Sequence, residues 1–390
     1  MKVVIIGAGV AGLGIGWRLA KAGVSVTVLE RGQVGNGATT ASAGMIAAAA
    51  EMGHAESAEA SFARRSSDIW PAFADEIEAE SAIAVGYRKN GSLMVALGGG
   101  NGRPPSHGGE HPGGANPHAQ GSGIKMLNAD QTRAMEPLLA NDVVGALWAP
   151  NEAQVDAQAI CRALAVAFVK AGGKVLSNET AVRIECEGGR VTGILTPFAT
   201  HRADVYVLAA GAWTSRIEGL PREALPPVVP IKGEIIVLSP PEGRRPPEHV
   251  VWGNEIYVVP RAGRILVGAT VEQAGFDTRL SREAFRWLRQ HAVGLMPDLE
   301  NWVLAEHWAG LRPASPDGKP ILGPSRLEGL YVASGQYRNG ILFAPAVADT
   351  MSRLILGQEE CAPDFDPRRF DGTEPPQLES VIETPHRTRG

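Results

Sequence analysis

Apolar and polar positions in residues 1–30 predict a strand, a helix and a second strand. The apolar run from Val3 to Ile6 is typical of a parallel strand that is buried on both faces. A helical pattern follows from Val10 to Ala22 and ends at Gly23, and a second strand extends from Val24 to Leu29. We therefore expect the chain to begin with the strand–helix–strand unit of a parallel sheet.

The remaining pattern falls into two kinds of segment. Helices are predicted over 157–171 and 340–356, strands over 174–176 and 181–185, and fully buried strands over 203–211 and 329–335. In contrast, strands joined by short turns follow one another over 228–238, 250–260 and 264–269, before a helix over 281–296. We expect an α/β fold, α+β overall, that combines a Rossmann-like domain with a second, mostly antiparallel β-sheet domain.

Two segments interrupt this pattern. A helix is predicted over 57–79, and Pro71 is expected to kink or divide it because proline removes a helical hydrogen bond. The segment 145–156 is interpreted as a turn-rich connection that ends at Asp156, a good helix N-cap.

Composition excludes several classes of protein. The chain has 390 residues and a formal net charge of −5, so it lacks the basic surface of a nucleic-acid-binding protein. Its three cysteines show no CxxC spacing, which favours a reducing compartment and argues against a structural metal. No segment has the ~18 to 20 apolar residues of a membrane span. We expect a cytoplasmic protein without a metal.

Two segments have little to bury. Residues 98–123 are more than half glycine and proline, which predicts a flexible insertion in a surface loop. Residues 358–390 are polar and rich in proline, which predicts a C-terminal tail that is partly wrapped at first and disordered at its end.

The first turn carries a nucleotide-binding motif. Gly7, Gly9 and Gly12 form G-x-G-x-x-G between a strand and a helix, which is the context in which the motif is informative. The helix N-terminus favours a phosphate group. Glu30, at the end of the second strand, can accept hydrogen bonds from both ribose hydroxyls.

Two further segments are candidates for ligand contact. The glycine-rich and hydroxyl-rich run 31–45 can close on a second phosphate or a flat ring, although a flexible connection is the alternative. The strand over 203–211 ends in Ala-Ala-Gly, where backbone can approach a ligand at the carboxyl edge of the sheet.

Together these motifs resemble a known family. The N-terminal unit, ATTASAGM, VLAAGAWT, IYVVPRAGRILVGAT, HWAGLRPASPDGKPILG and GQYRNGILFAPAVA are similar to FAD-dependent amine oxidases of the D-amino-acid oxidase superfamily, and most of all to the glycine oxidases of thiamine biosynthesis. The resemblance covers about residues 2–356, apart from the insertion. It implies an FAD-binding domain of residues 1–86, 145–220 and 305–357, and a substrate-binding domain of residues 87–144 and 221–304.

The resemblance implies a noncovalent FAD, because GLRP carries no cysteine where related sarcosine oxidases attach their flavin. The helix N-terminus after Gly340 would then face the flavin pyrimidine carbonyl. Val182 would approach the adenine through its backbone. The residues implied in cofactor binding are Gly7, Gly9, Val10, Ala11, Gly12, Glu30, Arg31, Ala38, Thr39, Thr40, Ala43, Gly44, Met45, Val182, Ala210, Gly211, Trp213, Arg338, Asn339, Gly340, Ile341 and Leu342.

Three residues are implied in substrate binding. Arg312 of GLRP would bind a substrate carboxylate through its planar guanidinium, unless it is an ordinary loop arginine. Tyr257 would donate a second hydrogen bond, unless it is an ordinary strand aromatic. Arg338 would lie at the flavin edge. No general acid or base is required, because positioning and electrostatics carry a hydride transfer to flavin.

The resemblance implies oxidation of glycine or another small amine, such as sarcosine or D-alanine, to an imine or glyoxylate, ammonia and hydrogen peroxide. Oxygen would be the electron acceptor and thiazole synthase a partner that takes the imine. A dehydrogenase that reduces a quinone and a subunit of a multi-subunit amine-oxidising complex remain alternatives, and a homo-oligomer remains open. Glu255 and Val271 stand where better-known glycine oxidases carry histidine and methionine, which leaves substrate preference open.

Overall fold

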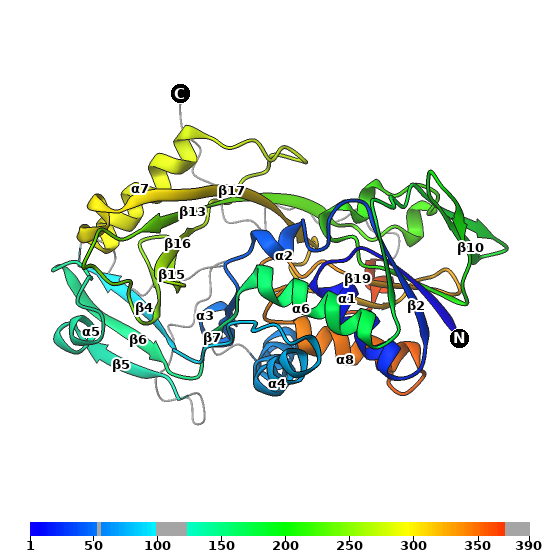
Figure 1. Cartoon of the computed structure of the whole chain (residues 1–390), viewed down its shortest axis with the longest axis horizontal. Coiled ribbons are helices and arrows are strands. Elements are labelled where there is room, and N and C mark those ends of the chain that lie inside the picture. Colours follow the sequence, from blue (N-terminus) through cyan, green and yellow to red (C-terminus); the bar gives the residue numbers. More distant parts are fainter. Residues whose placement is uncertain (53–55, 99–122, 371–390) are drawn as a thin grey trace.

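The computed structural model describes residues 1–52, 56–98 and 123–370. Nearly all of the expected flexible insertion, and the tail beyond residue 370, lie outside the described residues. The described chain forms two large sheets joined side by side, with short elements between them (Figure 1).

The first sheet contains the N-terminal strand at its centre. It has six strands in the order β18 (Ile321–Pro324), β19 (Leu330–Ser334), β12 (Val205–Leu208), β1 (Lys2–Ile6), β2 (Ser25–Glu30) and β8 (Lys174–Ser177). All neighbours are parallel except β18 and β19. Residues 3–6 of β1 are at most 5% exposed, as expected for a strand covered on both faces. The predicted Rossmann-like sheet is confirmed.

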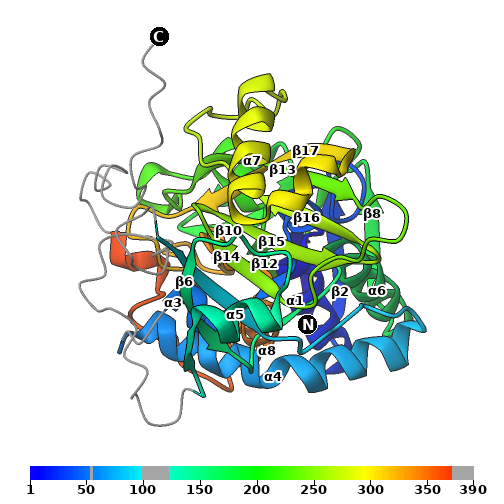
Figure 2. The same ribbon diagram turned by 90° about the vertical axis from the view of Figure 1, so that its left-hand side faces the viewer.

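Four helices pack together on one side of this sheet: α1 (Val10–Lys21), α4 (Ala58–Ser81), α6 (Ala157–Lys170) and α8 (Ala344–Ile355) (Figure 2). Of the two expected effects of Pro71, a division of the helix is wrong, because α4 is one helix of 24 residues that contains Pro71. Tertiary packing compensates for the proline: Trp70 and Phe73 on either side are buried, and Trp70 Nε1 donates to the carbonyls of Ile341 and Leu342.

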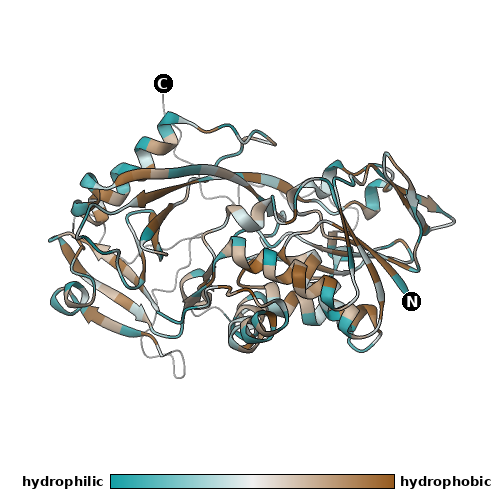
Figure 3. Cartoon of the chain, in the orientation of Figure 1, coloured by the Kyte–Doolittle hydropathy of each residue, from teal (hydrophilic) through white to brown (hydrophobic). Residues whose placement is uncertain are grey.

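The second sheet is mostly antiparallel, as predicted. Its order is β17 (Val303–Ala314), β13 (Val229–Ser239), β16 (Arg264–Gly268), β15 (Ile256–Arg261), β14 (Val250–Gly253), β4 (Ser92–Leu97), β6 (Val143–Ala149) and β5 (Lys125–Asn128). The helix α7 (Arg282–Leu295) contacts β13, β15 and β16, and the helix α5 (Ala129–Met135) contacts β5 and β6. The hydropathy pattern of α7 is amphipathic, and its apolar face packs on the sheet (Figure 3).

The prediction of a turn-rich connection over 145–156 was wrong in part. Residues 143–149 form β6, which pairs with both β4 and β5. Gly145 and Pro150 obscured this strand in the sequence, whereas buried Leu147 and Ala149 show its core face. Asp156 is the N-cap of α6 as predicted, and its carboxylate accepts from the N–H groups of Gln158 and Ala159.

Shorter elements complete the fold. They are α2 (Ala38–Ala41), β3 (Met45–Ile46), α3 (Ala48–Met52), β7 (Ala153–Gln154), β9 (Arg183–Glu187), β10 (Arg190–Leu195), β11 (Thr200–His201), η1 (Gly211–Arg216), η2 (Arg222–Ala224), η3 (Pro297–Asn301) and η4 (Pro367–Phe370). None of the helices in the described part of the chain is long and apolar enough to cross a membrane.

The division into an FAD-binding and a substrate-binding domain remains our proposal. The strands add one detail to the expected boundaries. β17 pairs with β13 along almost its whole length, and β6 belongs to the same eight-stranded sheet. The expected boundaries near residues 145 and 305 therefore fall within strands of that sheet.

Candidate functional site

A cavity of about 1960 Å³ lies between the two sheets. One wall comes from the turns that follow β1, β2 and β12, and the opposite wall comes from β13, β15 and β17. The short helices α2 and α3 carry further lining residues. The cavity is larger than the roughly 300–1,000 Å³ of a drug-sized ligand site, so it has room for a large cofactor together with a small substrate.

The glycines of the first turn permit close backbone packing. Gly7 has φ +106°, and a Cβ on Gly7 would overlap the carbonyl oxygen of Ala209. A Cβ on Gly12 would overlap the carbonyl oxygen of Gly7. Gly7 and Gly9 line the cavity, whereas Gly12 lies behind them and lets α1 approach the turn.

Gly12→Ala is therefore expected to destabilise this turn. The added methyl group must displace backbone, and overpacking of this kind costs about 1–3 kcal/mol. Thermal unfolding and the FAD content of the purified protein measure the effect. Gly14→Ala in the same helix is the matched control, because its Cβ would meet the Cβ of Ala348 at 3.1 Å and no closer atom. Equal losses in both variants would contradict the special position of Gly12.

The carboxylate of Glu30 is held at the cavity edge. Its two oxygens accept hydrogen bonds from the N–H groups of Ala8 (2.9 Å) and Gly32 (3.0 Å). A carboxylate oxygen has two lone pairs, so both oxygens keep acceptor capacity for the hydroxyls of a ribose. The geometry thus suits the nucleotide-binding chemistry predicted from the end of β2.

A cation and an aromatic ring stack on the same wall. The guanidinium carbon of Arg31 lies 3.4 Å from the ring centroid of Trp213, and both residues line the cavity. Phe276, in the segment between β16 and α7, contacts Trp213 with ring centroids 4.5 Å apart. This stack connects η1 to the segment between β16 and α7, so it joins the two halves of the structure at the cavity.

The segment 31–45 approaches the cavity as the sequence suggested. Thr39 Oγ1 accepts from the N–H of Val10 at 3.1 Å and so ties α2 to the start of α1. Arg261 donates to the carbonyls of Val155 and Ala43, which holds the backbone at Gly44 against β15. The alternative of a flexible connection does not describe this ordered segment.

Arg312 lies on β17 in the cavity wall, with its guanidinium over Gly233 of β13. Its Nη1 donates to the carbonyls of Thr270 (3.0 Å) and Lys232 (3.3 Å). Among the described residues, no carboxylate forms an ion pair with Arg312. The remaining N–H groups of this guanidinium are therefore available to an anionic ligand.

Tyr257, on β15, lines the same cavity and lies over Gly268 of the neighbouring strand. Burial raises the pKa of Tyr257, and the charges of Arg312 and Arg338 act in the opposite direction. The phenol therefore lies within electrostatic range of both arginines. It remains a neutral O–H donor at neutral pH.

Arg338 also lines the cavity, but its charge is compensated. Its Nη2 lies 2.5 Å from Oε2 of Glu51 on α3, and the two side chains are 20% and 9% exposed. Burial acts to lower the pKa of Arg338, but the charge and hydrogen bond of Glu51, with smaller contributions from Tyr337 and Tyr257, leave that pKa raised. Glu51 was missed in the sequence, because 287 residues separate it from its partner and its surroundings carry no motif.

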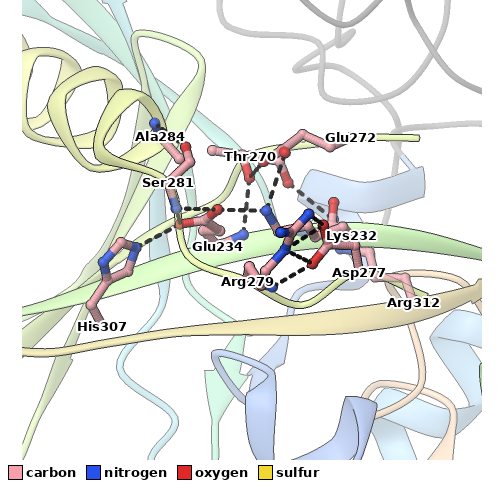
Figure 4. A network of polar contacts seen from close by, with 10 residues as sticks. All are labelled: Lys232, Glu234, Thr270, Glu272, Asp277, Arg279, Ser281, Ala284, His307 and Arg312. Carbon is pink, nitrogen blue, oxygen red and sulfur yellow. Dashed lines mark hydrogen bonds and ion pairs between the residues drawn. The ribbon is translucent and has the colours of Figure 1, made fainter. Parts of the chain in front are cut away.

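A buried polar network supports the carbonyls that hold Arg312 (Figure 4). Lys232 Nζ lies 2.7 Å from Glu234 and 3.3 Å from Glu272, and the Glu234 side chain is fully buried. Thr270 Oγ1 accepts from the N–H of Glu234 and donates to Glu272. The network joins β13 to the segment after β16, and these are the two places that supply the carbonyls in contact with Arg312.

Comparison with known proteins identifies the family. The sequence matches the family DAO, FAD dependent oxidoreductase, over residues 2–354. The chain belongs to this family. It is 33% identical to a glycine oxidase of Geobacillus kaustophilus over 367 residues, which cover 92% of this chain and 93% of that protein. The crystal structure of glycine oxidase from Geobacillus kaustophilus superposes with a TM-score of 0.83 at 32% identity, covering 95% of this chain and 98% of that chain.

A longer relative is also similar. The bifunctional protein ThiO/ThiG of Nostoc sp. (strain PCC 7120) is 36% identical over 361 residues, which are 92% of this chain and 53% of that protein. The chain thus spans about half the length of the bifunctional relatives that it matches.

The residues of this FAD-dependent oxidoreductase fit the cofactor of its family. The backbone at Gly7 and Gly9 can approach a pyrophosphate, and Glu30 offers acceptors for a ribose. At the other end of the cavity, Gln336 Nε2 is buried and has no hydrogen-bond partner among the described residues. A buried donor in a cavity wall calls for an acceptor, such as a carbonyl of a bound ring.

The structure brings nearly all the predicted site residues together at this cavity. The exceptions are Gly12, which packs behind the turn, and Val182. The N–H of Val182 donates to Leu195 and its carbonyl accepts from Glu218, so its backbone is already paired. The neighbouring Ala181 lines the cavity instead.

One prediction about the last helix was wrong. The helix α8 begins at Ala344 rather than directly after Gly340, because residues 340–343 form a turn closed by a hydrogen bond from Phe343 N to Asn339 O. Gly340, Ile341 and Leu342 line the cavity as this turn. As to metals, within the residues that the structure describes no three histidine, cysteine or acidic side chains are grouped as ligands.

Proposed function

We propose that the chain oxidises glycine and other small amino acids or amines, such as sarcosine and D-alanine, with oxygen as acceptor. For glycine the balanced reaction takes one O2 and one water and yields glyoxylate, ammonia and hydrogen peroxide. The observation that carries this proposal is Arg312, a cavity-wall guanidinium without a carboxylate partner among the described residues. The similarity to glycine oxidases supports the same reaction.

Binding of the amino acid is assigned to two residues. The guanidinium of Arg312 would bind the substrate carboxylate in a charge-assisted, bidentate manner. The neutral O–H of Tyr257 would donate to the same carboxylate. These contacts would leave the amino group and the α-carbon directed into the rest of the cavity.

Cofactor binding is assigned to the opposite wall. We propose that Gly7, Gly9 and Glu30 hold the adenosine and pyrophosphate, together with residues 38–45. Residues 338–342 and Gln336 would hold the flavin ring. When bound, FAD accepts a hydride from the substrate and passes the electrons to oxygen. The protein contributes the position of the substrate, so no side chain is assigned as general base.

The imine product also suggests a partner. The name ThiO/ThiG of the longer relatives supports a place in thiamine biosynthesis, and we propose that a thiazole synthase takes up glycine imine. We also propose that the protein is located in the cytoplasm.

A substrate panel tests the proposal. We expect the FAD-loaded protein to produce hydrogen peroxide in air with glycine, and to show bleached flavin absorbance when glycine is added without oxygen. Sarcosine, D-alanine and D-proline in the same assay rank the substrates. Flavin reduction without peroxide would contradict the oxidase and favour a dehydrogenase, and no reduction by any of the four would contradict the substrate class.

A further inference from the structure

The two arginines of the substrate side differ in charge compensation. Arg338 forms a close ion pair with Glu51, whose side chain is 9% exposed. Arg312 contacts backbone carbonyls, and no described carboxylate pairs with it. The cavity therefore contains two guanidinium groups, of which one is neutralised by the protein itself.

The position of Glu51 is fixed by the fold. Glu51 lies on α3, and Glu152 accepts hydrogen bonds at 2.8 Å from the N–H groups of both Ala49 and Ala50. Glu152 is 5% exposed and also accepts a hydrogen bond from Ser92 of β4. The backbone of the short helix is thus held to the eight-stranded sheet, which places Glu51 beside Arg338.

Tyr257 lines the same cavity as the two arginines and lies within electrostatic range of both. Burial is the largest influence on its pKa, and Arg312, Arg338 and Glu51 each act on it electrostatically. A substrate held by Arg312 and Tyr257 therefore lies within range of the Glu51–Arg338 pair. A second carboxylate on that substrate would meet the Glu51–Arg338 ion pair, whose net charge is zero. It would not meet an arginine whose positive charge is uncompensated.

We propose that Glu51 determines the charge class of the substrate: by neutralising Arg338, it makes the cavity select amino acids with one carboxylate and reject those with two. This inference rests on the proposed amino-acid oxidase function. Glu51 acts here as a specificity-determining residue through Arg338, and it takes no part in the reaction itself.

The test is a titration of the FAD-loaded protein with acetate and with malonate, followed by flavin absorbance and by the shift in unfolding temperature. In Glu51→Gln, Arg338 loses its ion pair with Glu51, so its charge is no longer compensated by that carboxylate and can attract a second carboxylate of the ligand. We expect the Kd of malonate to fall at least about ten-fold and that of acetate to change less than about three-fold, since one charge-assisted hydrogen bond suffices for a ten-fold change.

Glu306→Gln is the matched control. Glu306 also lines the cavity, and its carboxylate pairs with the half-exposed Arg264 at 3.0 Å. The Glu306→Gln variant removes one negative charge, as Glu51→Gln does, but it leaves the ion pair of Arg338 with Glu51 intact. Malonate affinity should therefore stay within about three-fold of wild type. Glu51→Gln combined with Arg338→Gln should abolish the gain. Equal tightening of both probes, or a gain that survives the loss of Arg338, would overturn the proposal.

Arg338→Gln alone provides a second test if Glu51→Gln does not fold. It leaves Glu51 as an unpaired anion, so malonate should weaken more than acetate. Unchanged relative affinities would overturn the proposal. These titrations need no turnover, so a protein that shows the malonate effect but makes no peroxide from glycine contradicts only the proposed function.

Discussion

Arg312→Ala is expected to raise the KM for glycine by at least about ten-fold, because a charge-assisted bidentate pair contributes on the order of 1.5–3 kcal/mol. Two of the five N–H groups of Arg312 are used by the carbonyls of Lys232 and Thr270. The remaining groups are those that the substrate carboxylate would occupy. Steady-state kinetics with glycine in air measure the change.

Two further variants sharpen this test. Arg312→Lys keeps the charge but loses the planar pair of donors, so its KM should lie between those of wild type and alanine. Arg264→Ala removes a half-exposed arginine from β16 in the same sheet, and its KM should stay close to wild type. An unchanged KM in Arg312→Ala would mean that the carboxylate binds elsewhere.

The second large effect concerns stability against pH. Burial raises the pKa of Glu152 to about 7, and the nearby charge of Glu51 adds to this rise, while hydrogen bonds from Ser92 and from the backbone oppose it. The pKa in the folded state is therefore above that of an unfolded glutamate. The folded protein holds this proton more tightly, so the contribution of Glu152 to stability is fully present below the pKa of an unfolded glutamate and is lost as the pH rises through about 7.

Glu152→Gln should remove this dependence. Its amide oxygen can accept from Ala49 and Ala50 and its NH2 can donate to Ser92, so the contacts of α3 are kept. Between pH 5 and 8 the wild type should lose on the order of 3 kcal/mol more of its unfolding free energy than the variant. Denaturant unfolding at several pH values measures the difference.

A second glutamate provides a comparison for the Glu152→Gln experiment. Glu59 also has a pKa raised to about 7, chiefly by burial, so Glu59→Gln should remove a separate part of the same dependence. The double variant should be the flattest of all. Parallel pH profiles in wild type and Glu152→Gln would show that Glu152 titrates alike in the folded and unfolded states.

Local signals predicted the parts of the site that lie close together in the sequence. Gly7, Gly9 and Glu30 act within one strand–helix–strand unit, whose periodicity and turn chemistry are set by neighbouring residues. Arg312 and Tyr257 were found through motifs that resemble a family. Neither hydropathy nor spacing distinguishes them from ordinary strand residues.

Local signals were wrong where tertiary packing overrides them. Pro71 lies inside an unbroken α4 because the flanking aromatic residues are anchored in the core. β6 was hidden by Gly145 within it and Pro150 directly after it, although it pairs with strands on both sides. The turn at 340–343 was predicted as helix because the helix start was placed at Gly340. A single glycine in the sequence does not show at which residue the helix begins.

By itself, the sequence determined the parallel sheet, the glycine turn and the end of the cavity to which we assign the nucleotide, because these depend on hydropathy period and backbone conformation within about 30 residues. Only the tertiary structure decided the charge of the substrate end. Whether an arginine is free or paired depends on which acidic side chain lies within a few ångströms of it. For Arg338 that partner is Glu51, 287 residues away, and for Arg312 no described carboxylate takes that place.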